Sequence, residues 1–308
     1  MTKNKADKTW KIFGVNSYQE YCEKFVVPSK FHSQVNEDVI KAYEICKRHM
    51  ENAWHHYPSY DEALKSLLTI FEMAIRIRSS AIGLDIAMRQ RPSLAELIKA
   101  LGKYGYDPLV DRMERIRAIR NVYAHPMRYG FAPPATARII VPILNLINLI
   151  FLDTTKVQRD FEYLNRINAN FQLIAGQTVG FIKNHKFQLV HSAKCIGAFT
   201  IGHANIAIWS IHPVIDGLSK LIADKRVLNS TTMATIQSNL VMANASFDPY
   251  SMSPASFCVT TDKHWPEKLR KYRLEWDQIS QQDQLNFLSL HESESYREYE
   301  ELQYKMRW

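Results

Sequence analysis

The segment Arg-Asn-Val-Tyr-Ala-His-Pro, residues 120–126, contains the residues whose types and spacing best suit catalysis. His125 follows Arg120 by five positions, at the end of a basic stretch that is expected to be helical. Histidine titrates near neutral pH, so it can act as a general acid or base. Arginine carries a permanent planar charge that holds a phosphate and stabilises charge on its oxygens. Because the ribose 2′-hydroxyl can be the nucleophile, this pair could cut RNA without a metal ion.

The spacing of these residues supports the catalytic interpretation only in part. Asn121 and His125 are four positions apart and share a helix face, whereas Arg120 and His125 lie about 140° apart on an ideal helix. They converge if the helix loosens before Pro126, where helical backbone is disfavoured, or if two chains meet there. A purely structural interpretation stays open, in which His125 caps the helix and interacts with its dipole.

The elements that would position this segment are helices throughout the first half of the chain. Hydrophobic periodicity predicts an antiparallel bundle, with Ser93 as an N-cap and a turn at Gly102, Gly105 and Asp107-Pro108. The first 35 residues are expected to form an arm or short helices. The expected helices of the bundle span residues 36–56, 61–88, 94–101, 107–124 and 135–152.

The second half has a different pattern, in which short apolar runs alternate with turn residues. These runs predict an antiparallel β-meander over residues 177–182, 187–193, 196–201 and 206–211. Helices are expected at Val214–Asp224 and, in the polar tail, at Asp277–Met306. The predicted fold is therefore mainly α: an N-terminal arm (1–35), a helical bundle (36–155) and a smaller α+β domain (156–308).

The motif and the order of helices around it resemble the HEPN superfamily, whose signature is an Arg, a polar residue and a His after four to six intervening residues. The resemblance covers about residues 36–155 and includes the stretch Leu67–Gly83 and the short helix Ser93–Leu101. It implies an all-helical endoribonuclease that acts as a homodimer, needs no metal or cofactor, and leaves 2′,3′-cyclic phosphate and 5′-hydroxyl ends. It implies that Arg120 binds the scissile phosphate, that His125 is the acid or base, and that Asn121 orients one of them. Glu72 matches a position where some members place an acid near the site.

The charge of the chain is compatible with a nucleic-acid partner. Lys and Arg total 39 against 31 Asp and Glu, which gives a net charge of +8. The predicted RNA contacts, which could equally form a solvated helix face, are Arg112, Arg115, Arg117 and Arg128. The resemblance suggests a toxin or anti-phage effector that cuts tRNA or mRNA, with an antitoxin or regulatory partner.

Three competing hypotheses remain from the sequence. The domain could be a non-catalytic HEPN module that binds RNA or a protein. A second loose match to the motif, Arg48–His55, lies on an earlier helix, where the family does not place its motif. A zinc site could form among the C-terminal histidines and Cys195, but their spacing matches no compact ligand pattern, and the expected strands send them to different faces. They are His185, His191, His203 and His212.

Composition excludes other classes of protein. Hydrophobic residues make up 46% and charged residues 23% of the chain, which excludes a disordered protein. The apolar stretch Ile139–Leu152 is too short to span a bilayer, and the first residues do not resemble a secretory signal. The four cysteines form no CxxC pair, so reduced thiols in a cytoplasmic protein are expected.

Overall fold

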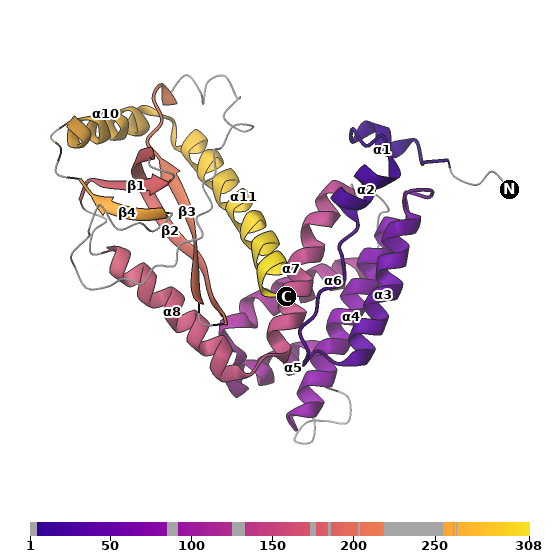
Figure 1. Cartoon of the computed structure of the whole chain (residues 1–308). Helices are drawn as coiled ribbons and strands as arrows, with labels where there is room; N and C mark the ends of the chain where they lie inside the picture. Colours follow the sequence, from indigo (N-terminus) through magenta and orange to yellow (C-terminus); the bar gives the residue numbers. More distant parts are fainter. Residues whose placement is uncertain are drawn as a thin grey trace. The chain divides into compact units, whose positions relative to one another are not determined.

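The computed structural model separates the chain into two compact units, Met1–Gln158 with Glu300–Trp308, and Arg159–Tyr299 (Figure 1). The described residues are mainly helical, with a small antiparallel sheet in the C-terminal half, which confirms the predicted fold class. No helix within the described ranges has the length and apolarity needed to cross a membrane. The structure describes residues 5–84, 92–124, 133–172, 177–183, 186–202, 204–218, 255–260, 262 and 264–308.

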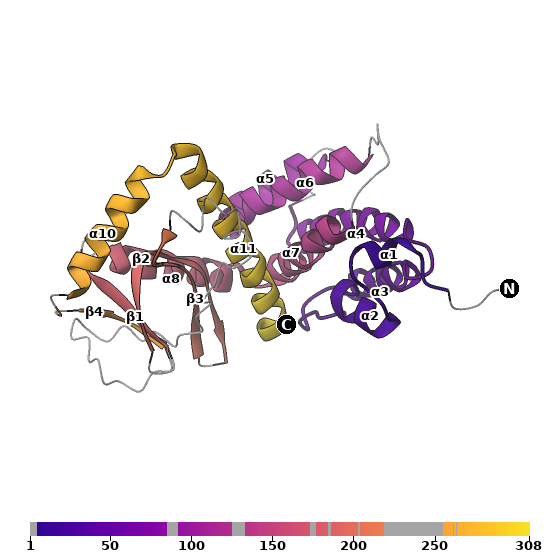
Figure 2. The same ribbon diagram turned by 90° about the horizontal axis from the view of Figure 1, so that it is seen from above.

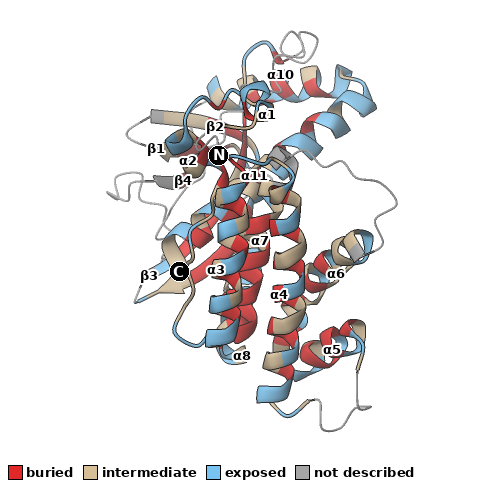
Figure 3. Cartoon of the chain, turned by 90° about the vertical axis from the view of Figure 1, so that its right-hand side faces the viewer, coloured by how far each residue is buried: buried red, intermediate tan, exposed pale blue. Residues whose placement is uncertain are grey.

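The first unit is a helical bundle whose core lies between its longest helices. The central helices carry continuous buried stripes, because apolar residues recur at helical spacing on one face of each (Figure 3). Two short helices in the first 35 residues pack on this core through Trp10, Tyr21 and Phe25. The helices are α1 (Thr9–Ile12), α2 (Tyr18–Phe25), α3 (Glu37–Asn52), α4 (Ser59–Ala81), α5 (Leu94–Leu101), α6 (Val110–Ala124) and α7 (Pro133–Phe151).

Helix boundaries in the bundle follow local capping, and the end of α4 differs most from the sequence prediction. Ser93 caps α5, as predicted, and the structure adds a capping box with Glu96. Helix α4 ends at Ala81, several residues before the predicted end at residue 88. Gly83 adopts φ 74°, and the amide of Leu84 donates to the carbonyl of Ser79, a pairing that terminates a helix.

The predicted turn at Gly102–Pro108 is a tight helical connection instead. A π-helical turn, Gly102–Tyr106, leads into a 3-10 turn, Asp107–Leu109, and then into α6. Gly105 has φ 123°, a conformation that disfavours any residue with a side chain. The connection keeps α5 and α6 close in space, so that the motif helix starts against the bundle.

The second unit is a sheet covered by helices. The strands are β1 (Val179–Lys183), β2 (Lys186–Ile201), β3 (Ala204–Pro213) and β4 (Ala255–Val259), in the antiparallel order β3-β2-β1-β4. Ala207, Trp209 and Ile211 of β3 pack with Phe171 of α8 (Thr154–Gln172). The intervening side chains of β3 point to the other face, where His212 meets α10 (His264–Gln278) and α11 (Gln281–Arg307). Figure 2 shows these helices around the sheet.

The second unit departs from the sequence prediction in several elements. The strands predicted at 187–193 and 196–201 form one long strand, β2, with register shifts at Val190/Ser192 and Cys195/Gly197. The side chain of Asn168 bonds both backbone groups of Cys195 at the second shift. Residues 214–217 are not helical, and most of the helix predicted to Asp224 lies outside the described residues. Helices α8 and α10 and strand β4 were not predicted, and α11 spans nearly the whole predicted tail helix.

The chain end belongs to the first unit rather than to the C-terminal domain predicted at 156–308. Glu300 and Tyr304 on α11 are buried there, and the Trp308 indole donates to the buried Asn145 of α7 at 2.7 Å. The first 35 residues also belong to this unit rather than forming a separate arm. These contacts join segments that are more than 150 residues apart, which local sequence patterns do not encode.

Candidate functional site

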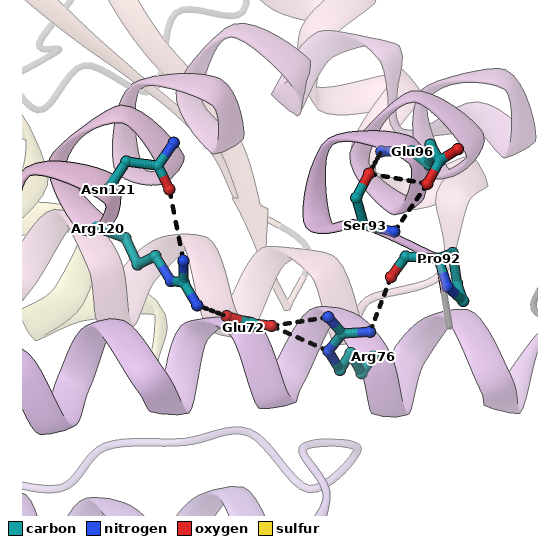
Figure 4. Close-up of polar contacts among 7 residues, drawn as sticks. All are labelled: Glu72, Arg76, Pro92, Ser93, Glu96, Arg120 and Asn121. Carbon is teal, nitrogen blue, oxygen red and sulfur yellow. Dashed lines mark hydrogen bonds and ion pairs between the residues drawn. The ribbon is translucent and has the colours of Figure 1, made fainter. Parts of the chain in front are cut away.

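The candidate site lies between α4 and α6, where a carboxylate from one helix meets an arginine from the other. Arg120 is on the last turns of α6, and its guanidinium donates to Glu72 of α4 at 2.8 Å. The same guanidinium lies 3.5 Å from the amide oxygen of Asn121 (Figure 4). Three of the four residues assigned to catalysis therefore lie together.

Glu72 binds a second arginine that the sequence analysis had given no role. Arg76, one helical turn further along α4, donates to the other carboxylate oxygen of Glu72 at 2.8 and 3.1 Å. Arg76 also donates to the carbonyl of Pro92 at 3.1 Å, just before the capped start of α5 (Figure 4). The i, i+4 spacing of Glu72 and Arg76 was a signal that could have predicted this pair.

The electrostatics of this group leave an excess positive charge near solvent. One carboxylate is shared by two guanidinium groups, so the three side chains carry a net charge of +1. The Glu72 side chain is only 18% exposed, whereas that of Arg120 is 38% exposed. Glu72 is thus the less exposed partner of the ion pair, and Arg120 keeps a larger accessible surface.

Tyr123, between the arginine and the histidine of the motif, is not suited to act as a base. Burial raises the pKa of Tyr123 to about 12, and the nearby charge of Asp61 contributes. A phenol with this pKa stays neutral at physiological pH, so it cannot accept a proton from a ribose hydroxyl. Within the motif, this leaves His125 as the candidate acid or base.

His125 and Arg128 lie outside the described residues, so the predicted approach of His125 to Arg120 stays a prediction. The described part of α6 ends at Ala124, directly before the histidine. Arg120 lies one turn before that end, and Glu72 holds it from the neighbouring helix.

The predicted RNA-binding arginines of α6 differ in their surroundings. Arg112 donates to Glu300 at 2.7 Å, and that carboxylate also accepts from the buried Asn145, so Arg112 has a structural contact. Arg117 pairs with Glu114 on the same helix at 2.6 Å. Arg115 is exposed, and its Nε donates to a carbonyl of its own helix.

The competing sites also have defined positions. Arg48 of the second loose motif is exposed on α3, and His55 is exposed beyond the end of that helix. The prediction that the C-terminal histidines point to different faces is wrong for His191 and His212, whose ring centroids are 4.9 Å apart. His185 and His203 are not among the described residues. In the described ranges, no group of three His, Cys, Asp or Glu residues could hold a metal ion.

Comparison with known proteins adds no family assignment. No family model, no curated protein and no solved structure matches the chain. The arguments for function therefore come from the motif, its resemblance to HEPN domains and the geometry around Arg120.

Replacing Glu72 tests whether the carboxylate positions Arg120. We expect Glu72→Gln to lower any RNA-cleavage rate about tenfold, because the neutral amide loses a charge-assisted hydrogen bond to the guanidinium. The free energy of unfolding should change by less than about 1 kcal/mol, since Arg76 and Arg120 are both partly exposed. Initial rates and urea denaturation of the same preparations measure both quantities. An unchanged cleavage rate would show that Glu72 does not position Arg120.

Proposed function

We propose that this protein is an endoribonuclease of the HEPN type, which cleaves RNA by attack of a ribose 2′-hydroxyl and does not use a metal ion. The observation that carries the proposal is the position of Arg120. It lies at the end of the motif helix, five residues before His125, and is held by Glu72 of the neighbouring helix. A fixed arginine, followed five positions later in the sequence by a histidine, the residue type that ordinarily titrates near neutral pH, supports the proposal.

The proposed reaction needs only proton transfers and charge stabilisation. His125 accepts the proton of the 2′-hydroxyl, whose oxygen attacks the adjacent phosphorus. The bond from phosphorus to the 5′-oxygen breaks, and this oxygen receives a proton as it leaves. Arg120 stabilises the negative charge on the non-bridging oxygens of the phosphate. The products are a 2′,3′-cyclic phosphate and a 5′-hydroxyl.

A homodimer would supply the second proton-transfer group that this reaction needs. The imidazole that acts as the base becomes protonated by the 2′-hydroxyl, so a separate group has to protonate the leaving 5′-oxygen, and a protonated second copy of His125 can serve as this acid. The exposed arginine of α6, Arg115, and the partly exposed Arg117 are the proposed contacts to the RNA backbone. Arg112 is left out of this set because it already binds Glu300.

The function is tested by cleavage of RNA in the presence of EDTA. The wild-type chain should cut a mixture of tRNA and mRNA, and His125→Ala should cut about 10²- to 10⁴-fold more slowly. Circular dichroism must show that the variant keeps its helical content. Cleavage by His125→Ala at the wild-type rate would refute the proposal.

A non-catalytic module that binds RNA or a protein is the second candidate. The two arginines that share Glu72, Arg76 and Arg120, are as compatible with this function as with catalysis. Glu72 already neutralises part of their charge, so a phosphate contact without chemistry is consistent with the same geometry. This candidate predicts RNA binding without turnover and with an affinity that His125→Ala does not change. Because both functions allow an unchanged affinity, the RNA recovered from a filter-binding titration with the wild-type chain and this variant is also examined for cleavage, which only the endoribonuclease predicts.

A further inference from the structure

Three histidines from separate elements of the second unit form a cluster on the sheet face opposite α8. His191 is on β2, His212 on β3 and His291 on α11. The ring centroid of His212 lies 4.9 Å from that of His191 and 5.8 Å from that of His291. His191 has no partner in the strand register because the ladder shifts between Val190 and Ser192. We call these three residues the histidine cluster.

The histidine cluster lies in an aromatic environment that joins the helices to the sheet. The ring of His212 is 5.2 Å from Trp276 of α10 and 5.0 Å from Phe287 of α11. His191 lies 5.2 Å from the ring of Tyr272 on α10. His212 is 2% exposed and His291 is 7% exposed. Part of the contact of α10 and α11 with the β2–β3 hairpin therefore runs through imidazole rings.

The hydrogen bonds of the cluster suit neutral imidazoles. Nε2 of His212 bonds to the hydroxyl of Tyr272 at 2.8 Å, and Nε2 of His291 donates to the carbonyl of Ile211 at 3.1 Å. Nδ1 of His191 and Nδ1 of His212 are buried and have no hydrogen-bond partner among the described residues. A protonated imidazole has two N–H donors, so a proton added to His212 leaves a buried donor without an acceptor.

Charged neighbours do not offset the free-energy cost of protonating these buried histidines. Burial, together with the charges of His191 and His291, lowers the pKa of His212 to about 3. Burial also lowers the pKa of His191; Arg273 on α10 acts in the same direction, and the carboxylate of Asp277 offsets only part of the shift. The groups that face His291 are the hydroxyl of Ser210 at 3.4 Å and His212. The closed arrangement thus favours the neutral forms of His191 and His212.

We propose that the histidine cluster is an acid-sensitive latch, whose protonation separates α10 and the part of α11 around His291 from the β2–β3 hairpin. In the opened form the imidazoles are solvated and bind protons below about pH 6.5. The closed form binds fewer protons there, so the equilibrium shifts towards opening as the pH falls, and the shift vanishes about one pH unit above 6.5. At pH 5 one such histidine alone raises the opening constant about thirtyfold.

Hydrogen exchange of the full-length chain tests the latch. Peptides from α10 and from α11 around His291 should exchange about thirtyfold faster at pH 5.0 than at pH 7.5, after correction for the intrinsic pH dependence of exchange. Peptides from α3 and α4, which lie in the other unit, serve as internal references and should change far less. Equal protection of α10 and α11 at the two pH values would overturn the proposal.

Variants identify the histidine responsible. His212→Phe combined with Tyr272→Phe removes the titrating ring without leaving an unpaired hydroxyl, and should abolish most of the pH-dependent exchange. His264→Gln is the matched control, because His264 is exposed at the start of α10, and it should keep the full effect. If the double variant does not fold, NMR of the wild-type chain decides, because the chemical shifts of the His212 ring report whether it is protonated at pH 5. His212 that is protonated at pH 5 within the closed fold would contradict the latch, as would a folded double variant that keeps the full pH dependence.

Discussion

Arg120→Ala is expected to lower the rate of RNA cleavage about 10²- to 10³-fold, because it removes the fixed cation from the phosphate in the transition state. Arg120→Lys should recover part of this loss, since it restores the charge but not the planar pair of donors that matches a phosphate. Initial rates with a labelled RNA in EDTA measure both variants. The loss should appear at saturating RNA, because the charge develops as the phosphate reacts.

The second loose motif provides the matched control for this prediction. Arg48→Ala and His55→Ala remove the same residue types from α3 and its end, where both side chains are exposed. These variants should cleave RNA at the wild-type rate. Equal losses in the Arg48 and Arg120 variants would indicate a general effect of positive charge, and would contradict a specific role for Arg120.

Glu300→Leu is expected to lower the free energy of unfolding of the first unit by about 3 kcal/mol. The Glu300 side chain is only 11% exposed and accepts hydrogen bonds from Arg112 and from the fully buried Asn145. The substitution removes the carboxylate, and the Arg112 guanidinium and the Asn145 amide each lose a hydrogen-bond acceptor. Denaturant-dependent hydrogen exchange of peptides from α6 and α7 measures the stability of this unit separately from the other.

The neighbouring residue is the control for the stability prediction. Glu301 is exposed on the same helix, so Glu301→Leu should change the free energy of unfolding by less than about 0.5 kcal/mol. A double-mutant cycle of Glu300→Leu with Arg112→Met should show a coupling energy above about 1 kcal/mol. Additive effects of the two substitutions would show that the ion pair does not stabilise the unit.

Sequence reasoning predicted the elements whose signals are local. The apolar stripe of α4 and the N-cap Ser93 of α5 are each encoded within one helix, and both were predicted. Glu72 was assigned to the site through the family resemblance, and it does contact Arg120. The partner of Arg112 could not be predicted, because Glu300 is 188 positions further along the chain.

The errors in the second unit also have physical causes. The register shift at Cys195/Gly197 breaks the apolar alternation of β2, so one strand resembled two. Helices α8 and α10 were missed because most of their residues are polar. Only a minority of their side chains, such as Phe171 of α8, pack in the core. The close approach of the His191 and His212 rings depends on the register shift between Val190 and Ser192, and residue spacing in the sequence does not predict such a shift.

The most direct test of the proposed chemistry is the identity of the ends left by the wild-type chain on RNA cut in EDTA. Attack by the 2′-hydroxyl predicts a 2′,3′-cyclic phosphate on one fragment and a 5′-hydroxyl on the other, and no cutting where that hydroxyl is methylated. Mass spectrometry of the fragments distinguishes these ends from 3′-hydroxyl and 5′-phosphate ends. Fragments with 5′-phosphates, or efficient cutting of the methylated RNA, would contradict the role proposed for Arg120 and His125.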